Sequence, residues 1–169
     1  MIEVCDNFLE EDIFKDFEKR FCGAYMSWYF NGAVVFPWDE DTLDNYQFVH
    51  TTYKNGCPHS ENHDYTLPLL EKLGVKVLLR SKFNLQTRTT EIVKRSFHSD
   101  MSSLFDDGFS YKTAIFYVNT NDGYTEFESG EIVKSVANRC LRFDGNQMHR
   151  GTTCTNSKNR IVLNINYIS

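Results

Sequence analysis

Residues 112–145 read KTAIFYVNTNDGYTEFESGEIVKSVANRCLRFDG, and this stretch decides the expected fold. Runs of β-branched and aromatic residues alternate in it with clusters of Asn, Asp, Gly and Ser. The runs predict short strands, and the clusters predict the turns between them. The expected strands cover residues 112–119, 125–127, 131–133 and 139–143, and the expected turns cover 119–123, 129–130 and 144–146. Short strands separated so regularly are typical of a β-sandwich or a β-barrel.

The same pattern extends to both sides of this stretch. Further strands are expected over residues 75–90, 92–100 and 160–168, with another turn signal at Asp106-Asp107-Gly108. Because no long helical segment separates these strands, the pattern argues against a doubly wound parallel sheet.

The first 74 residues show a different pattern. Apolar side chains recur at helical spacing over residues 7–22 and predict a helix there, namely Phe8, Leu9, Ile13, Phe14, Phe17 and Phe21. Strands are expected over residues 27–36 and 46–53, a loop over 54–64 and a short helix over 66–73. We therefore expect one domain over residues 1–169, in which residues 1–74 form a helical and strand support for a β core over 75–169.

Composition limits the classes of function. The chain has 169 residues, 15% of them aromatic, and a formal net charge of -5. It contains no run of basic residues, which disfavours a nucleic-acid partner. Its five cysteines are scattered without a CxxC motif, which indicates free thiols in a reducing compartment. No leader-like or membrane-spanning stretch is visible, so we expect a soluble, cytoplasmic protein without a membrane partner. The oligomeric state is left open.

Candidate metal ligands follow the expected strand over residues 92–100. Residues i and i+2 of a strand point to the same face, so His98 and Asp100 would offer an imidazole and a carboxylate to one point. His149 follows the turn at residues 144–146. Two histidines and one carboxylate form the facial triad that leaves three positions of Fe(II) open. The sequence thus predicts that His98, Asp100 and His149 are metal ligands and the catalytic centre.

A candidate anion-binding residue opens the last expected strand. Arg160 lies 11 residues after His149. A guanidinium there can donate two parallel hydrogen bonds to a carboxylate, such as the distal carboxylate of 2-oxoglutarate. Arg160 is therefore the predicted binding residue for this co-substrate.

The sequence resembles the 2-oxoglutarate/Fe(II)-dependent dioxygenases of the prolyl 4-hydroxylase-like group, and in particular their small bacteriophage-encoded members. The resemblance covers most of the chain, in the motifs DNFL at 6–9, SWYF at 27–30, RSKFNL at 80–85, HSD at 98–100, TAIFYVN at 113–119, GYTEF at 123–127, NRCLRFDG at 138–145, HRG at 149–151 and RIVLN at 160–164. It implies a double-stranded β-helix, or jelly-roll, fold with supporting N-terminal helices. It also implies the same metal ligands and the same role for Arg160.

The resemblance implies further pocket residues. Tyr117 takes the place of a tyrosine that binds the distal carboxylate of 2-oxoglutarate in related oxygen-sensing hydroxylases. Asn84, Gln86 and Arg88 share one face of an expected strand that lines the substrate pocket in relatives. Arg88 replaces a frequent tyrosine there, and it would bind a carboxylate or an acidic substrate, or point to solvent. Val162 stands where some families have a hydroxyl-bearing residue.

The implied activity is hydroxylation of an unactivated C–H bond with Fe(II), 2-oxoglutarate and O2, with release of succinate and CO2 and with stimulation by ascorbate. The implied substrate is a prolyl or other residue in a peptide or protein, and a small metabolite is an alternative. Two other classes stay open: a non-enzymatic jelly-roll module for binding or virion association, and a cupin-like metal enzyme that uses no 2-oxoglutarate. For a phage-encoded protein, the compartment would be the host cytoplasm.

Overall fold

A computed structural model gives the structure of the chain and describes residues 1–35, 45–101 and 109–169. Its elements, in chain order, are β1 (Glu3–Cys5), α1 (Glu11–Phe21), β2 (Tyr29–Asn31), β3 (Gln47–Lys54), β4 (Cys57–Pro58), a 3₁₀ turn (Glu61–Thr66), α2 (Leu67–Lys72), β5 (Val77–Thr87), β6 (Lys112–Tyr117), β7 (Tyr124–Phe127), β8 (Ile132–Lys134), β9 (Arg139–Asp144), β10 (His149–Gly151) and β11 (Asn159–Ile168).

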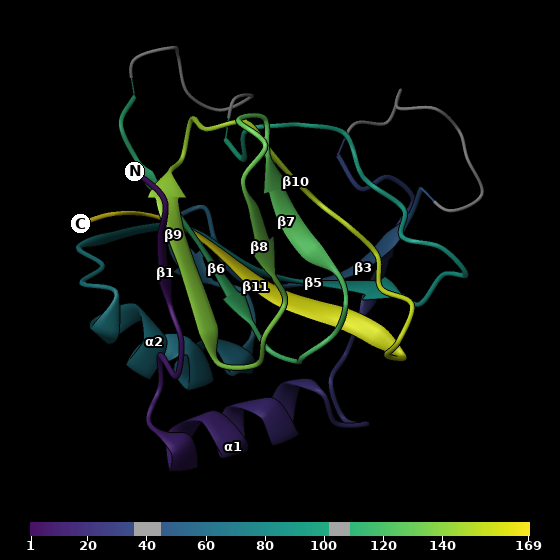
Figure 1. The fold of residues 1–169 in the computed structure, drawn as a ribbon. Coiled ribbons are helices and arrows are strands. Elements are labelled where there is room, and N and C mark those ends of the chain that lie inside the picture. Colours follow the sequence, from purple (N-terminus) through teal and green to yellow (C-terminus); the bar gives the residue numbers. More distant parts are fainter. Residues whose placement is uncertain (36–44, 102–108) are drawn as a thin grey trace.

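The described strands form two antiparallel sheets. The larger sheet has the strand order β1-β9-β6-β11-β5-β3-β2, with β4 paired to β3, and the smaller has the order β10-β7-β8. β11 is central in the larger sheet because it pairs with both β5 and β6. Figure 1 shows the smaller sheet in front of the larger one. Residues that face inward from β5, β6 and β11 therefore look toward the smaller sheet.

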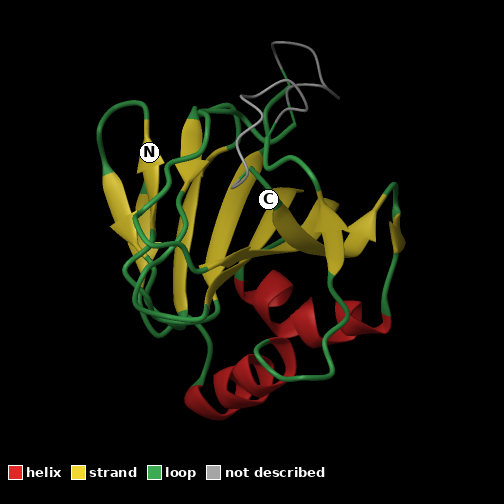
Figure 2. Ribbon diagram, turned by 90° about the vertical axis from the view of Figure 1, so that its right-hand side faces the viewer, coloured by secondary structure: helices red, strands yellow, loops and turns green. Residues whose placement is uncertain are grey.

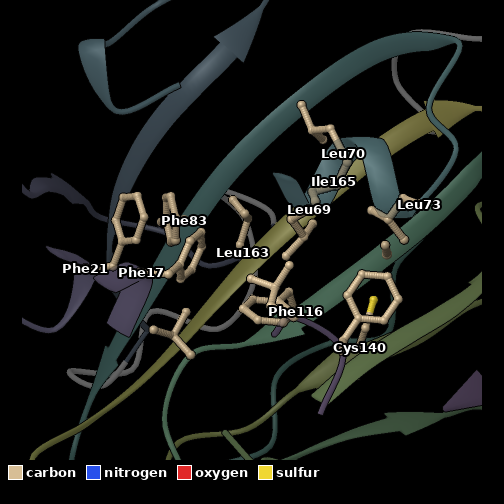
Figure 3. Close-up of a cluster of buried hydrophobic side chains, with 14 of the residues drawn as sticks. Phe17, Phe21, Leu69, Leu70, Leu73, Phe83, Phe116, Cys140, Leu163 and Ile165 are labelled. Atoms are coloured by element: carbon tan, nitrogen blue, oxygen red, sulfur yellow. The ribbon is translucent and has the colours of Figure 1, made fainter. Parts of the chain in front are cut away.

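The two helices cover the other face of the larger sheet (Figures 1 and 2). Phe14, Phe17 and Phe21 recur on one side of α1 and are buried. Phe21 stacks on Phe83 of β5 with ring centroids 4.1 Å apart, and Phe17 meets Phe116 of β6 edge to face (Figure 3). This core fixes α1 on the sheet by burial of large aromatic side chains.

A second core lies between the two sheets. Ile115, Leu141 and Val162 of the larger sheet pack there with Phe127 and Val133 of the smaller one. Successive side chains of a strand alternate between faces. On β6, Phe116 therefore joins the helix-side core while Ile115 and Tyr117 join the inter-sheet core. The same alternation on β11 sends polar side chains into the space between the sheets.

The expected mainly β architecture with supporting helices is confirmed, but several boundaries were wrong. The expected strand over residues 92–100 is reduced to two isolated bridges, Lys94 with Thr152 and His98 with His149, because its hydrogen bonds to the chain around β10 are interrupted. The expected strand over residues 27–36 is reduced to β2, and Phe36 lies outside the described residues. The helix begins at Glu11 rather than residue 7, since Asn7 adopts a φ of 50°.

Three short strands were not predicted, namely β1, β4 and β10. Each has two or three residues, which is too short for an alternating pattern to stand out. The predicted turn at 106–108 lies outside the described residues. In the part of the chain that the structure describes, no helix is long and apolar enough to cross a membrane.

Candidate active site

The structure brings His98, Asp100 and His149 together. Their possible ligand atoms all lie within 4.8 Å of one another. The backbones of His98 and His149 exchange two hydrogen bonds of 3.0 Å, which place the two rings side by side with centroids 4.8 Å apart. Nε2 of His98 lies 4.0 Å from one oxygen of Asp100, and Nε2 of His149 lies 3.8 Å from the other. One nitrogen of each ring thus faces the carboxylate.

Backbone carbonyls fix the tautomer of both histidines. Nδ1 of His98 lies 3.2 Å from the carbonyl oxygen of Ser96, and Nδ1 of His149 lies 3.0 Å from that of Gln147. A carbonyl only accepts hydrogen bonds, so Nδ1 carries the hydrogen and Nε2 presents its lone pair to the centre. Burial lowers the pKa of His98, which favours the neutral imidazole that a metal ion binds.

The Asp100 carboxylate is held by four side chains from the larger sheet. The Asn164 amide donates to both carboxylate oxygens at 3.1 and 3.0 Å, and the Asn166 amide donates to one of them at 3.0 Å. Arg80 and Thr113 donate at 3.1 and 3.2 Å. Burial alone would raise the pKa of Asp100, but His149, Arg80 and His98, with the Asn164 hydrogen bond, hold this pKa below its ordinary value. The group is therefore a carboxylate, the form that binds metals.

Sequence reasoning missed these four partners of Asp100. A signal for two of them was present, because Asn164 and Asn166 alternate with apolar Leu163 and Ile165 in an expected strand. Polar side chains on one face of a buried strand need partners. The sequence alone did not show that Asp100 would be that partner.

Arg160 is 4% exposed and lines a pocket that is also lined by His98, Asp100 and His149. Its Nε donates to Oγ of Ser135 at 2.8 Å, and its Nη2 donates to Oγ1 of Thr125 at 3.2 Å. Within the described residues, no carboxylate forms an ion pair with Arg160. Burial lowers the pKa of the Arg160 guanidinium. A buried cation without an anionic partner is unfavourable, so the arrangement favours an anionic ligand.

Two glycines leave room for the Arg160 side chain. A Cβ atom on Gly123 would lie 2.6 Å from Cδ of Arg160 and 2.7 Å from the Thr153 carbonyl oxygen. A Cβ on Gly151 would lie 3.4 Å from Nη1 of Arg160. Any larger residue at position 123 would displace the arginine, so the glycine belongs to the construction of the anion site.

Tyr117 lies beside Arg160 but does not line the pocket. The Arg160 guanidinium carbon is 5.7 Å from the centre of the Tyr117 ring. The Tyr117 hydroxyl donates to Oγ1 of Thr125 at 2.8 Å, with the Val133 carbonyl oxygen at 3.4 Å. Oγ1 of Thr125 accepts from both Tyr117 and Arg160, so its own hydrogen is left to donate into the pocket. Thr125 was not predicted from the sequence.

One pocket joins the metal-ligand cluster to Arg160. It is lined by Val34, Gln47, Lys82, Asn84, Gln86, His98, Asp100, Ile115, Thr125, His149, Gly151, Arg160, Val162 and Asn164. Asn84 and Gln86 therefore lie where the sequence placed them. Arg88 does not: it is exposed and borders a separate surface groove with residues 155–158. The strand ends at Thr87, so strand alternation no longer directs the side chain of residue 88.

Sequence comparisons give no relatives: no protein-family model matches the chain, and a search of curated proteins finds no match. Comparison with solved structures finds similar folds. The non-heme alpha ketoglutarate dependent epimerase SnoN from nogalamycin biosynthesis is 13% identical, with a TM-score of 0.67 over 99% of this chain and 78% of that chain. SnoN has also been solved with Fe3+, alpha ketoglutarate and nogalamycin RO.

Two prolyl hydroxylases are also similar. The prolyl-4-hydroxylase of Pseudomonas putida is 16% identical, with a TM-score of 0.60 over 98% of this chain and 91% of that chain. The Trichoplax adhaerens prolyl hydroxylase, solved with a peptide fragment of hypoxia inducible factor, is 9% identical, with a TM-score of 0.65 over 98% and 83% of the two chains. The expected double-stranded β-helix, or jelly-roll, fold is confirmed by these likenesses.

Proposed function

We propose that this chain is an oxygenase that depends on Fe(II) and 2-oxoglutarate and hydroxylates a C–H bond of its substrate. One observation carries the proposal: a single pocket has a cluster of two histidines and a carboxylate at one end and, at the other, a buried arginine that pairs with no carboxylate of the described residues. The first is a ligand set for a non-heme iron, and the second is a site for a carboxylate.

The residues present fit both groups. Nε2 of His98 and His149 and the Asp100 carboxylate would hold Fe(II) on one face. Arg160 and the hydroxyl of Thr125 would hold the distal carboxylate of 2-oxoglutarate, while the Tyr117 ring packs beside the guanidinium. When bound, iron would activate O2 as the oxidant, and 2-oxoglutarate would be oxidised to succinate and CO2 as the substrate is hydroxylated.

Neighbouring residues of the chain hold the three metal ligands in the form and orientation that metal binding requires. Ser96 and Gln147 hold the hydrogen of each histidine away from the centre, and Asn164 holds both oxygens of Asp100. The apolar side chains of Ile115 and of Val162, which lies between Arg160 and Asn164 on β11, line the pocket and would limit the entry of water. A peptide or protein residue, such as a prolyl residue, and a small molecule are both within the proposed substrate range, since the similar folds include proteins solved with each.

The direct test is succinate formation by the purified protein with Fe(II), 2-oxoglutarate and O2, followed by NMR. We expect His98→Ala to abolish it and Arg160→Met to raise the dissociation constant of 2-oxoglutarate at least tenfold. With Ni(II) in place of iron, 2-oxoglutarate at 100 times its dissociation constant should stabilise the wild type by about 2.7 kcal/mol. Arg160→Met should lose this stabilisation while it keeps the bound metal.

If the wild type binds neither metal nor 2-oxoglutarate, the enzyme proposal is wrong and a non-catalytic jelly-roll module replaces it. If it binds metal but 2-oxoglutarate neither stabilises it nor is consumed, a cupin-like metal enzyme replaces it.

A further inference from the structure

Lys82 of β5 is a cation in the pocket that the proposed function does not use. Its side chain is half-buried and lines the pocket together with Asp100 and Asn164. Burial and the nearby Arg80 lower the pKa of the Lys82 ammonium to about 8. Lys82 forms no hydrogen bond or ion pair with any residue that the structure describes. A lysine in this setting is unfavourable unless an anion joins it.

The position of Lys82 separates it from the arginine site. Lys82 pairs with Asn164 across the β5–β11 ladder, whereas Gln86 pairs with Arg160. Four residues along a strand correspond to roughly 13 Å. Lys82 therefore lies at the metal end of the pocket, four residues along β5 from the position that faces Arg160.

The charges around the pocket leave an excess of positive charge. Arg80, Lys82 and Arg160 are cations, and Asp100 is the one carboxylate among the described residues that line or contact them. A divalent metal ion adds two positive charges, and 2-oxoglutarate removes two. Arg80 is already paired with Asp100. Among the residues that the structure describes, Lys82 is thus the cation left without a partner once metal and co-substrate are bound.

An unused acceptor lies next to Lys82. The amide nitrogen of Asn164 donates to Asp100, which fixes the orientation of the amide, and its buried Oδ1 accepts no hydrogen bond from the residues that the structure describes. Asn164 is 6% exposed and lines the pocket. A buried acceptor without a donor is unfavourable. The metal end therefore offers a cation for an anionic group and, beside it, an acceptor for an N–H or O–H group.

We propose that Lys82 determines substrate specificity: its ammonium holds a carboxylate of the molecule to be oxidised, close to the metal ligands. The proposal rests on the proposed function and adds that the substrate is acidic, with an N–H or O–H donor near its carboxylate. A free amino or hydroxy acid, or an acidic peptide residue, has this chemistry.

Acetate is the probe for this site, with acetamide as its neutral counterpart. Protein loaded with Ni(II) and saturated with 2-oxoglutarate is titrated with each, and binding is followed by ¹H–¹⁵N NMR. We expect acetate to bind at least tenfold more tightly than acetamide. Lys82→Met should weaken acetate at least tenfold, and Lys82→Arg should retain it. Lys76→Met, which removes an exposed lysine just before the same strand, should leave acetate binding unchanged.

The dissociation constant of 2-oxoglutarate, measured in the same variants, identifies the source of the carboxylate. We expect Lys82→Met to change it less than twofold. A tenfold loss of 2-oxoglutarate binding with unchanged acetate binding would assign Lys82 to the co-substrate and overturn the proposal. Equal acetate binding by wild type and Lys82→Met would overturn it as well. Failure of the wild type to bind 2-oxoglutarate would instead refute the proposed function, and acetate titration of the metal-free protein would then decide on the Lys82 site separately.

Discussion

Asp100 has more hydrogen-bond donors than its role as one metal ligand requires. Four side chains contact its two oxygens, and Asn164 alone contacts both. Such outer contacts orient a ligand and keep it ionised. They also restrain the carboxylate before any metal arrives, so metal affinity should depend on them.

Replacement of Asn164 tests this restraint. Asn164→Leu keeps the volume of the side chain but removes both hydrogen bonds to Asp100. We expect Ni(II) affinity, measured by calorimetry, to fall about 10- to 100-fold. Asn84→Leu is the matched control, because Asn84 lines the same pocket without a hydrogen bond to Asp100. Equal losses in the two variants would mean that the contact with Asp100 is not what matters.

Lys82 gives the stability of the metal-free protein a particular pH dependence. Its pKa is lowered from 10.5 to about 8 in the folded chain. Between these two values the unfolded chain binds more protons at this residue, so the free energy of unfolding rises with pH. The difference in unfolding free energy between wild type and Lys82→Met should rise from pH 7.5 to pH 10.5, by roughly 2 kcal/mol. Urea unfolding measures it, and a difference that stays flat with pH would contradict the low pKa.

Strand β5 carries the pocket on one face and the helix-side core on the other. Lys82, Asn84 and Gln86 point into the pocket, while Phe83 is fully buried against Phe17 and Phe21 of α1. Strand alternation thus makes one element responsible for both packing and chemistry. The position of Lys82 relative to Asp100 depends on how firmly α1 holds this strand.

Phe83→Ala should therefore be costly. Removal of a fully buried phenylalanine is expected to lower the free energy of unfolding by about 3–5 kcal/mol. Ile13→Ala on the outer side of α1 is the control, because Ile13 is 39% exposed and its loss should change stability by less than about 0.5 kcal/mol. Urea unfolding of both variants gives the comparison, and similar losses would refute the view that the aromatic stack anchors α1.

At the scale of the whole molecule, the N-terminal segment is tied to the turn before β9. β1 lies beside β9 in the larger sheet (Figure 1). The side chain of Asn138 accepts a hydrogen bond from the Leu9 amide and donates one to the Leu9 carbonyl, both at 2.8 Å. The Phe8 amide donates to the Asn138 carbonyl at 2.8 Å. These contacts join residues about 130 positions apart in sequence and place α1 under the sheet.

Asn138→Ala should release this link. Asn138 is 6% exposed, so the variant leaves two backbone groups of Leu9 without their partner, at about 1–3 kcal/mol each. Asn138 also has a φ of 60°. Asn55→Ala controls for that backbone conformation, since Asn55 has a φ of 54° but is exposed. Thermal or urea unfolding should show a clearly larger loss of unfolding free energy for Asn138→Ala than for Asn55→Ala. Equal losses would mean that the backbone conformation alone accounts for the effect.

The sequence by itself determined what depends on the local backbone. Alternating residues in short runs predicted the mainly β architecture, and the spacing of Phe14, Phe17 and Phe21 predicted which face of α1 is buried. The same local rule placed Asn84 with Gln86 on one face of β5, whereas His98 and Asp100 meet outside any strand, where His98 bridges to His149. It failed for Arg88, because the rule holds only within a strand and β5 ends one residue earlier.

Only the tertiary structure decided which strands are neighbours and in which register. Arg80, Lys82, Thr113, Asn164 and Asn166 meet around Asp100 because β11 pairs with both β5 and β6. The packing of both cores selects that order of strands, and no local pattern in any one strand encodes it. The sequence also predicted Arg160 as an anion-binding residue from its place in the chain. Only the tertiary structure showed that Ser135, Thr125 and Gly123 surround it and that no carboxylate of the described residues pairs with it.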